Sequence, residues 1–405
     1  MRNIFKSAIA ILFCITAFTA CDDDSIFHAK VKTANGITTV SDIRAGGLER
    51  AFLIGLSTVK HLVINDTIDS RDFQTMRHKM TNLTVLDLSN ATIAAYNGSE
   101  GSGGSRVYHY TADAIPEFAF YNPFTSQGKK SLTTIIFPKS VKSIRDYAFN
   151  STGLSGTLTI PPSVRDTIGK NAFSFCEGLT TINLSSASYI GESAFQACSN
   201  LTGALIIPDS VFEVKPWAFA YCDKISSISI SKTVNAIGNT AFMNCGGNFT
   251  VDSQNTNYSA LDGVLFNADK STVVRFPTTK SGSYTLPESL GSIAPYAFSG
   301  CNAVSKIILP AAAFIIEDYA FSECAALSEI NIPEGMFYIG RFAFLSCTTL
   351  SRIYAKPTTP IDLTESLSAF SGVNTSNCTL YVPIGTKSSY ANAVGWSSFS
   401  KIVEN

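Results

Sequence analysis

The sequence predicts a β-rich repeat solenoid, and two observations carry this prediction. An Ala-Phe pair returns along the chain, mostly every 22 to 24 residues, and a fixed period of this length is typical of stacked structural repeats. Each unit also contains a short alternation of apolar and polar residues, which indicates a β-strand. The pairs begin at Ala148, Ala172, Ala194, Ala218, Ala241, Ala297, Ala320, Ala343 and Ala369. The length of 405 residues therefore reflects a number of repeats rather than a number of globular domains.

The repeated unit is approximately L-x-x-I-x-I-P-x-S-V-x-x-I-G-x-x-A-F-x-x-C, from residue 132 to residue 370. Its first segment predicts a strand in which Leu179, Ile182 and Leu184 point inward. Thr181 and Asn183 then point outward, towards solvent. The proline that follows cannot donate a ladder hydrogen bond, so we expect strand pairing to end there.

The second half of the unit predicts a tight turn around the Ala-Phe pair. The glycines at positions 169, 191, 238 and 340 predict backbone angles that other residues resist. The phenylalanines are expected to fill the far side of each coil as structural core residues. They are Phe149, Phe173, Phe195, Phe219, Phe242, Phe298, Phe321 and Phe344.

The unit I-P-x-S-V-x-x-I-G-x-x-A-F-x-x-C resembles the BspA-type leucine-rich repeat, and the resemblance covers about residues 115–370. It implies a right-handed solenoid of the leucine-rich-repeat type, with a parallel sheet on one face, short helical or irregular turns on the other, and capped ends. The family consists of secreted and cell-surface repeat proteins. Roles proposed for it centre on adhesion and on binding host proteins.

The chain divides into five predicted parts. Residues 1–20 are a lipoprotein signal peptide, and residues 21–29 form a tether. Residues 30–113 hold an N-terminal cap and the first leucine-rich repeats, and residues 114–370 hold the BspA-type repeats, with a hairpin insertion at about 249–286. Residues 371–405 are a C-terminal cap.

The N-terminal leader has positive charge followed by an apolar run, which is the order of a secretory signal. The motif Phe-Thr-Ala-Cys that ends at Cys21 resembles the lipobox of bacterial lipoproteins, and this implies a lipid anchor on Cys21. Three aspartates at 22–24 follow; they resemble an acidic surface-export tag, with a solvated tether as the alternative. We expect an exported lipoprotein of the outer membrane or cell surface.

Residues 59–68 and 83–93 both fit L-x-x-L-x-L-x-x-x-x-I, so we expect them to be the first coils. A helix is predicted between them, from Arg71 to Met80. A second helix, from Asp42 to Leu56, is predicted to cover the open end of the solenoid. Residues 96–113 predict a surface excursion, whose tyrosines either cover a neighbouring coil or stack on a sugar.

One interval, the 56 residues from Phe242 to Phe298, breaks the period. Two apolar runs on either side of residues 267–271 predict a hairpin that buds from the coil. The aspartates of this segment match no calcium-binding loop, so no metal is expected. In the C-terminal cap, Tyr381, Tyr390 and Trp396 are expected to lie buried over the last coil.

Seven cysteines follow the phenylalanines by three residues, at Cys176, Cys198, Cys222, Cys245, Cys301, Cys324 and Cys347, whereas Cys378 is out of register. A residue in phase with the repeat is most simply a small buried hydrophobe, which a free cysteine can be. The alternative is a set of disulfides between neighbouring coils, which approach bonding distance. The sequence has no C-x-x-C motif and all four histidines precede the main array, so we expect no zinc site and no cofactor.

Charge and composition restrict the function. The formal charge of -1 supplies no field to attract nucleic acid, so no nucleic-acid partner is expected. Nucleophilic catalysis needs a base beside the nucleophile, and the main array contains no histidine. We therefore expect no enzymatic activity.

Binding is the expected function, because stacked strands present a continuous row of outward side chains. This row is neutral before the insertion and charged after it. Its C-terminal part, the candidate binding face, consists of Lys306, Ile308, Glu329, Asn331, Arg352 and Tyr354. Arginine and tyrosine are enriched at interface hot spots; the alternative is that these are solvated strand residues.

The sequence thus predicts a non-enzymatic cell-surface binding protein, adhesin-like, with a protein or host-matrix ligand. One alternative is a glycan-capturing lipoprotein that serves an uptake system, for which Tyr354 is the one stacking ring of the row. Another is a structural envelope protein without a specific ligand.

Overall fold

The computed structural model describes residues 29–52, 55–104, 107–184 and 186–405. The predicted signal peptide and the predicted lipid-attachment residue Cys21 lie outside these ranges. Within them, no helix combines the length and the apolar content that a membrane span requires.

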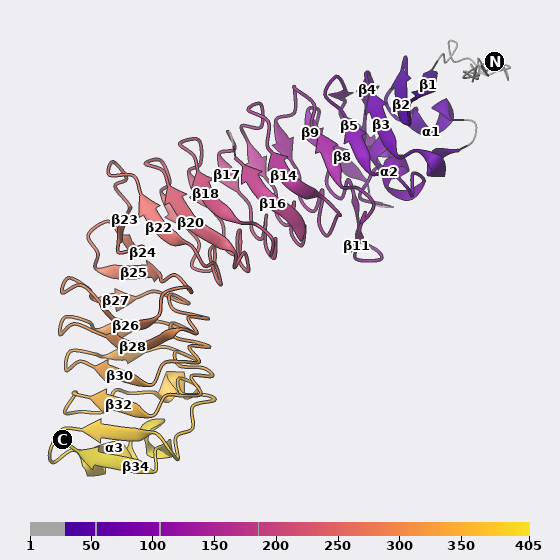
Figure 1. Cartoon of the computed structure of the whole chain (residues 1–405). Helices are drawn as coiled ribbons and strands as arrows, with labels where there is room; N and C mark the ends of the chain where they lie inside the picture. The colour runs from indigo at the N-terminus through magenta and orange to yellow at the C-terminus, as the bar shows by residue number, and fades with distance from the viewer. Residues whose placement is uncertain (1–28, 53–54, 105–106, 185) are drawn as a thin grey trace, which may run out of the picture.

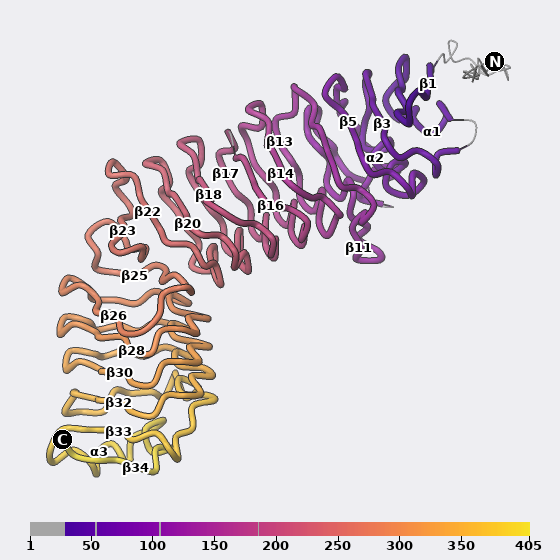
Figure 2. Tube along the Cα trace, viewed as in Figure 1, coloured from indigo at the N-terminus to yellow at the C-terminus, as the bar shows by residue number. Residues whose placement is uncertain are grey.

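The described chain is a parallel β-solenoid, which confirms the predicted fold class. Figure 1 shows two arms of stacked coils that meet at an angle near β23, β24 and β25, and the tube in Figure 2 follows the coils through both arms. Each coil adds one strand to a broad sheet and, in most coils, a two-residue strand to a second, narrow sheet. The second sheet was not expected from the sequence.

The broad sheet runs through both arms in four hydrogen-bonded sections. Its strands are β1 (Lys30–Ala34), β2 (Ile37–Ser41), β3 (His61–Ile64), β5 (Val85–Asp87) and β12 (Thr134–Ile136), then β14 (Ser155–Thr159) and β16 (Gly178–Asn183), then β18 (Gly203–Ile207), β20 (Ile225–Ile230) and β22 (Asn248–Val251), and finally β26 (Gly282–Thr285), β28 (Val304–Ile308), β30 (Glu329–Ile332), β32 (Arg352–Ala355), β33 (Thr379–Val382) and β34 (Lys401–Glu404).

The narrow sheet runs alongside in three sections. Its strands are β4 (Thr67–Ile68) and β6 (Thr92–Ile93), then β9 (Ala114–Ile115), β13 (Ser143–Ile144), β15 (Thr167–Ile168), β17 (Tyr189–Ile190), β19 (Glu213–Val214) and β21 (Ala236–Ile237), then β23 (Tyr258–Leu261), β24 (Val264–Asn267), β25 (Thr272–Arg275), β27 (Ser292–Ile293), β29 (Ile315–Ile316) and β31 (Tyr338–Ile339).

Helices and separate hairpins complete the fold. The α-helices are α1 (Leu48–Ala51), α2 (Ser70–His78) and α3 (Lys387–Asn392), and the 3-10 helices are η1 (Leu56–Thr58), η2 (Thr364–Ser366) and η3 (Trp396–Ser398). The two hairpins pair β7 (Tyr96–Gly98) with β8 (Tyr108–Tyr110), and β10 (Tyr121–Asn122) with β11 (Gln127–Gly128).

The strand segment of the repeat alternates as predicted. Leu179, Ile182 and Leu184 are buried, whereas Thr181 and Asn183 are exposed. Apolar residues of neighbouring strands are paired in register, so the inward row continues from coil to coil. The core is therefore a column of aliphatic side chains closed on the far side by the Ala-Phe turns.

Successive Ala-Phe turns are joined by backbone hydrogen bonds and by stacked rings. The N–H of Phe173 donates to the carbonyl of Ala194 at 2.8 Å, and the N–H of Phe195 donates to that of Ala218 at 2.8 Å. The rings of Phe173 and Phe195 lie 5.2 Å apart and nearly parallel. All eight phenylalanines expected in the core are buried, and each turn thus fixes the position of the next.

The role predicted for the repeat glycines is wrong. Positive φ angles occur two residues after the glycine, as at Asn171 (53°) and Ser193 (56°), and not at the glycines of the I-G step. A Cβ atom on Gly191 would instead lie 2.7 Å from the carbonyl carbon of Gly169 in the preceding coil. Glycine is required here because two backbones come together closely.

The cysteines of residues 176–378 are buried and free, as the first of the two interpretations predicted. They also form hydrogen bonds: the thiol of Cys176 donates to the carbonyl of Phe149 at 3.1 Å, and that of Cys198 to the carbonyl of Phe173 at 3.2 Å. Burial raises the pKa of Cys176 to about 11. Cysteine at this position therefore fills space and supplies a donor to the coil before it.

A buried arginine lies against the first Ala-Phe turn of each arm. Arg77 donates to the carbonyls of Phe118 and Tyr121, and Arg275 donates to those of Tyr296 (2.6 Å) and Ser299 (3.0 Å). The two pairs of carbonyls are equivalent in the repeat. Neither guanidinium has a carboxylate partner among the described residues, and burial lowers both pKa values, that of Arg77 to about 10.

The N-terminal end differs from the prediction. The expected helix from Asp42 to Leu56 is reduced to the single turn of α1, because Gly46 has a φ of +77° and breaks it. The antiparallel pair β1–β2 forms the edge of the sheet there. The helix predicted from Arg71 to Met80 is present as α2.

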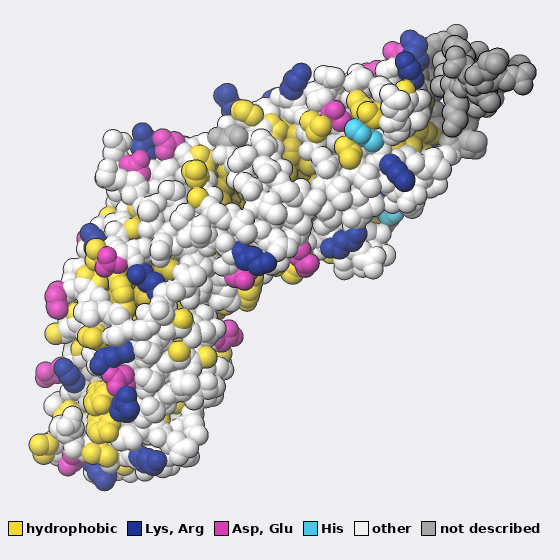
Figure 3. Space-filling model, in the orientation of Figure 1, with side chains coloured by type: hydrophobic (Ala, Val, Ile, Leu, Met, Phe, Trp, Pro, Cys, Tyr) yellow, Lys and Arg dark blue, Asp and Glu magenta, His cyan; other side chains and the backbone are white. Residues whose placement is uncertain are grey.

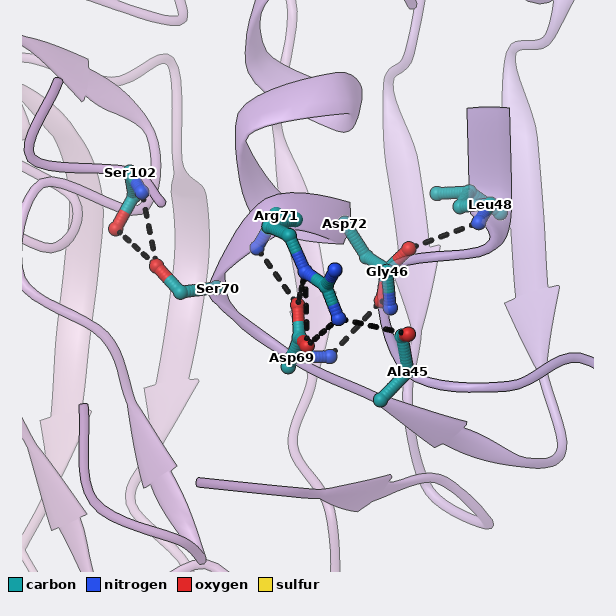
Figure 4. Close-up of polar contacts among 8 residues, drawn as sticks. All are labelled: Ala45, Gly46, Leu48, Asp69, Ser70, Arg71, Asp72 and Ser102. Carbon is teal, nitrogen blue, oxygen red and sulfur yellow. Dashed lines mark hydrogen bonds and ion pairs between the residues drawn. The ribbon is translucent and has the colours of Figure 1, made fainter. Parts of the chain in front are cut away.

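The carboxylate of Asp72 links α2 to the segment that contains α1 (Figure 4). It accepts backbone N–H groups from Gly46 at 2.7 Å, Leu48 at 2.8 Å and Asp69 at 2.9 Å. Burial raises the pKa of Asp72 to about 6. Arg71 in turn donates to the carboxylate of Asp69, so the start of the helix is held from both sides.

The insertion pairs as a hairpin, but it does not bud from the coil. β24 and β25 are antiparallel, and β25 continues in parallel with β27 of the next coil. Val264, Leu265 and Phe266 are fully buried, and the apolar core divides into two clusters at this point. The insertion therefore acts as an irregular coil between the two arms.

The N-terminal excursion and the C-terminal cap both use aromatic side chains as cover. Tyr110 is buried and stacks on Tyr96 at 6.0 Å. Tyr390 and Trp396 are fully buried, as expected, and each donates a hydrogen bond to a backbone carbonyl. The expected burial of Tyr381 is wrong, because this side chain is half-buried on the outer face of the sheet.

Truncating one ring of the phenylalanine stack should destabilise the protein strongly. We expect Phe195→Ala to lower the free energy of unfolding by about 3–5 kcal/mol, because it leaves a cavity between two rings. Phe337 is 65% exposed, so Phe337→Ala is the matched control and should change stability by less than about 0.5 kcal/mol. Denaturant unfolding measures both variants, and equal effects would contradict the buried stack.

The cysteines should be unreactive in the folded chain. The described thiols are buried and therefore inaccessible. Burial also raises the pKa of Cys245 and Cys301 to about 12, and the thiolate is the reactive form. Alkylation followed by peptide mapping should modify none of the cysteines of residues 176–378 under native conditions and all of them in denaturant without reductant. Cysteines that remain unmodified in denaturant until a reductant is added would show disulfides instead.

Candidate binding surface

Three of the predicted face residues lie side by side on neighbouring strands of the C-terminal arm. Lys306 on β28 is paired in register with Glu329 on β30, which is paired with Arg352 on β32. Because alternate residues of a strand share a face, the three side chains emerge on the same side of the sheet. Figure 3 shows hydrophobic and charged side chains of both signs gathered on the visible face of this arm.

Glu329 is the centre of a small ion network. Arg352 donates to one carboxylate oxygen at 2.8 and 3.0 Å, and Lys306 donates to the other. The hydrogen bonds from Lys306 and Arg352 hold the pKa of Glu329 below its usual value. Exposed ion pairs contribute only about 0–1 kcal/mol to stability, so the network orders these side chains more than it stabilises the fold.

Two of the six residues of the predicted binding face contribute to the structure of the sheet instead. The side-chain amide of Asn331 donates to the carbonyl of Leu309 at 3.0 Å and accepts the N–H of Leu309 at 3.0 Å. It thereby joins β30 to the preceding coil beyond the point where backbone pairing ends. Ile308 is half-buried at the end of β28 and has no polar group to offer.

Tyr354 has a stacking partner that sequence reasoning missed. It is paired in register with Tyr381 on β33, and the two rings lie 4.7 Å apart at an angle of 12°. The alternation of β33 contains the signal, since Leu380 and Val382 are buried and Tyr381 must therefore face outward. The sheet face thus carries a pair of tyrosines rather than one.

A hollow of about 380 Å³ opens beside the tyrosine pair. Its lining residues are Asn331, Tyr354, Ala355, Lys356, Tyr381, Val382, Pro383 and Asn405. We call the tyrosine pair and this hollow the tyrosine site. It combines apolar and aromatic surface with a polar rim, which is typical of small-ligand sites.

The charge around the tyrosine site is predominantly positive. Lys356 lines the hollow, and Lys401 lies on the same sheet face as Tyr381, one strand further on. Both lysines are exposed and neither forms an ion pair with a described residue. Glu329 is paired with two cations, and the carboxylate of Glu404 accepts two backbone N–H groups. Among the described residues, the charged side chains left without a partner beside the tyrosine pair are therefore those of Lys356 and Lys401.

A second hollow of about 280 Å³ lies beside the β7–β8 hairpin and is lined in part by Glu117, Arg145 and Asp146. Burial and the nearby Asp146 raise the pKa of Glu117. Its charges have both signs, and its aromatic wall includes Tyr110, whose hydroxyl accepts the N–H of Gly103. This hollow gives no preference for one kind of charge, and the tyrosine site is the better candidate.

The described residues contain no group of three or more His, Cys, Asp or Glu side chains that could hold a metal ion. The described cysteines are buried, and burial raises the pKa of Cys176 to about 11, whereas a thiolate is needed for metal binding or nucleophilic attack. The chemistry that this surface supports is recognition through charge, hydrogen bonds and aromatic contact.

Comparison with known families agrees with the repeat. A model of the BspA type leucine-rich repeat region matches residues 112–260 and 273–392, in six copies. The chain belongs to the BspA-type leucine-rich repeat family. The residues between the two matched segments of BspA-type repeats contain β24 and the turn before β25, which is where the core divides.

Several solved structures resemble this BspA-type chain. A leucine-rich repeat protein from Eubacterium ventriosum is 22% identical over 65% of this chain and 72% of its own, with a TM-score of 0.47. A leucine rich cell surface protein from Faecalibacterium prausnitzii is 21% identical over 93% and 98%, with a TM-score of 0.48. The pneumococcal vaccine antigen PcpA is 16% identical over 93% and 96%, with a TM-score of 0.45. A comparison with curated proteins finds no match.

The ion network predicts the titration of Glu329. As pH falls, the carboxylate should stay charged below its usual pKa, because protonation would break its hydrogen bonds to Lys306 and Arg352. The ion pairs are therefore intact at neutral pH and are lost as pH falls through the lowered pKa. Carboxyl ¹³C NMR of glutamate-labelled protein should show this pKa rise in the K306A/R352A variant.

The matched control for this titration is K224A. Lys224 belongs to another coil and contacts Asn200, so its removal should leave the pKa of Glu329 unchanged. A Glu329 pKa that does not move when both neighbouring cations are removed would contradict the network.

Proposed function

We propose that this chain is a non-enzymatic binding protein of the cell surface, adhesin-like, which holds a protein or host-matrix ligand on its C-terminal sheet face. The face consists of Lys306, Glu329, Arg352 and Tyr354. The observation that carries the proposal is the ordered row Lys306–Glu329–Arg352 next to a stacked tyrosine.

The surface chemistry supports a binding role. Arginine and tyrosine are the residue types that dominate interface energetics, since both offer large contact areas together with hydrogen bonds. The ion network holds Arg352 in one orientation, so less side-chain entropy is lost when a partner binds. The lipid anchor predicted at Cys21 and the signal peptide before it would display this face at the outer membrane or cell surface.

A second candidate function is glycan capture by a surface lipoprotein that serves an uptake system. The tyrosine pair favours it, because sugar sites commonly use aromatic rings and the face carries two of them. A third alternative is a purely structural envelope protein with no ligand on this face. Absence of binding in the following test would favour it.

Binding of extracellular-matrix proteins should depend on the four face residues. The chain from Asp22 onward, assayed against a panel of immobilised matrix proteins, is expected to bind at least one of them. The variant K306A/E329A/R352A/Y354A should bind that protein at least about tenfold more weakly, which corresponds to about 1.4 kcal/mol.

The control for this variant changes the same number of outward residues in the N-terminal arm, by alanine at Thr157, Thr159, Thr181 and Asn183. These side chains are exposed and uncharged, so the control should bind like the wild type. Unchanged binding by the K306A/E329A/R352A/Y354A variant, or equal losses in both variants, would refute the proposed face.

A further inference from the structure

We propose that the tyrosine site binds an acidic oligosaccharide, that is, a sugar chain carrying carboxylate or sulfate groups. This inference rests on the proposed binding function and names the class of ligand that one part of the face would hold. Three features of the site carry it: the shape of the aromatic pair, the hydrogen-bonding groups that remain open, and the unpaired positive charge.

The aromatic pair provides an apolar strip of a size that suits a sugar ring. Along the sheet, the outward row reads Asn331, Tyr354, Tyr381 and Val403, so a shorter side chain stands on each side of the two rings. The tyrosines therefore rise above their neighbours and form one wall of the hollow of about 380 Å³. The C–H groups of a pyranose can pack against such a wall, while its hydroxyls point to the polar rim.

The rim has both donors and acceptors to offer. Asn331 uses one amide hydrogen and one lone pair of its side chain on the backbone of Leu309, which leaves one of each free. Asn405 lines the other end of the hollow, and its backbone N–H is held by the carbonyl of Val382. Hydroxyl groups, which donate and accept, match this mixed rim better than a purely apolar ligand would.

Charge decides between neutral and acidic sugars. Lys356 and Lys401 carry exposed ammonium groups without an ion-pair partner among the described residues, and Arg352 adds a third cation whose partner Glu329 is shared with Lys306. The nearby Glu404 is engaged by the backbone N–H groups of Gly385 and Lys387. An anionic group on the ligand would be attracted to the lysines by its charge, whereas a neutral sugar would lack this coulombic attraction.

The test uses matched pairs of glycan probes that differ in charge. They are a tetramer of galacturonic acid and its methyl ester, sialyllactose and lactose, and a heparin octasaccharide and its desulfated form. At least one acidic probe is expected to bind at least about tenfold more tightly than its partner, equivalent to about 1.4 kcal/mol. Binding should also weaken steeply as salt is added, because the charges are exposed.

Variants separate the aromatic from the ionic contribution. Y354A/Y381A should abolish binding of the acidic probe, and K356A/K401A should reduce the preference for it over its less charged partner. The controls are Tyr189→Ala, which removes an exposed tyrosine of β17 in the other arm, and Lys224→Ala. Both controls should bind the probe like the wild type.

The outcomes distinguish this inference from the proposed function. If no acidic probe binds better than its partner, or if Y354A/Y381A binds as well as the wild type, the inference is overturned. Matrix-protein binding that is lost in the K306A/E329A/R352A/Y354A variant would then leave the proposed function standing. Absence of both glycan and matrix-protein binding would overturn both.

Discussion

The backbone hydrogen bond between one Ala-Phe turn and the next is the interaction on which the rest of the structure depends. Each turn donates forward, as Phe149 does to Ala172 and Phe298 does to Ala320, and the phenylalanine rings stack along the same row. The cysteine thiols donate in the opposite direction, to the preceding coil. In such an array the first turn has no complete Ala-Phe turn in front of it to donate to its carbonyls, and a buried polar group without a partner costs about 1–3 kcal/mol. At the start of the first arm, Arg77 donates to the carbonyls of Phe118 and Tyr121. In the second arm the N–H of Phe276 donates to the carbonyl of Ala297 at 2.8 Å, and Arg275 donates to the flanking carbonyls of Tyr296 and Ser299.

This arrangement leaves function to the outer surface. The described cysteines are buried, and most of their thiols donate to a backbone carbonyl of the preceding coil. The outward strand positions are less constrained, since a change there alters neither the core nor the turn ladder. In the C-terminal arm these positions carry the ion network and the tyrosine pair. The turn ladder therefore explains both why the core and turn residues repeat from coil to coil and why the outward strand residues can vary.

Features that recur from coil to coil could be predicted from the sequence, whereas features that occur at a single position could not. The period, the inward strand residues and the buried cysteines all appear many times, so each occurrence supports the others. Arg275 appears once and looks like a surface residue until the carbonyls it meets are known. Tyr381 was placed in the cap because an aromatic residue near the end of a chain suggests a plug, although the alternation of its own strand points it outward. The glycines were assigned to unusual backbone angles, whereas close contact between coils, which involves residues more than twenty positions away, is the actual reason.

Native-state hydrogen exchange of the turn amides in the wild type and in Arg275→Met tests the central claim most directly. If Arg275 holds the first turn of the second arm in place, its loss should lower the protection of the amides of Phe298 and Phe321 while those of Phe173 and Phe195 keep theirs, because opening would be confined to the C-terminal arm. Equal loss of protection in both arms, or unchanged protection at Phe298, would contradict the claim that each arm depends on a buried arginine at its first turn.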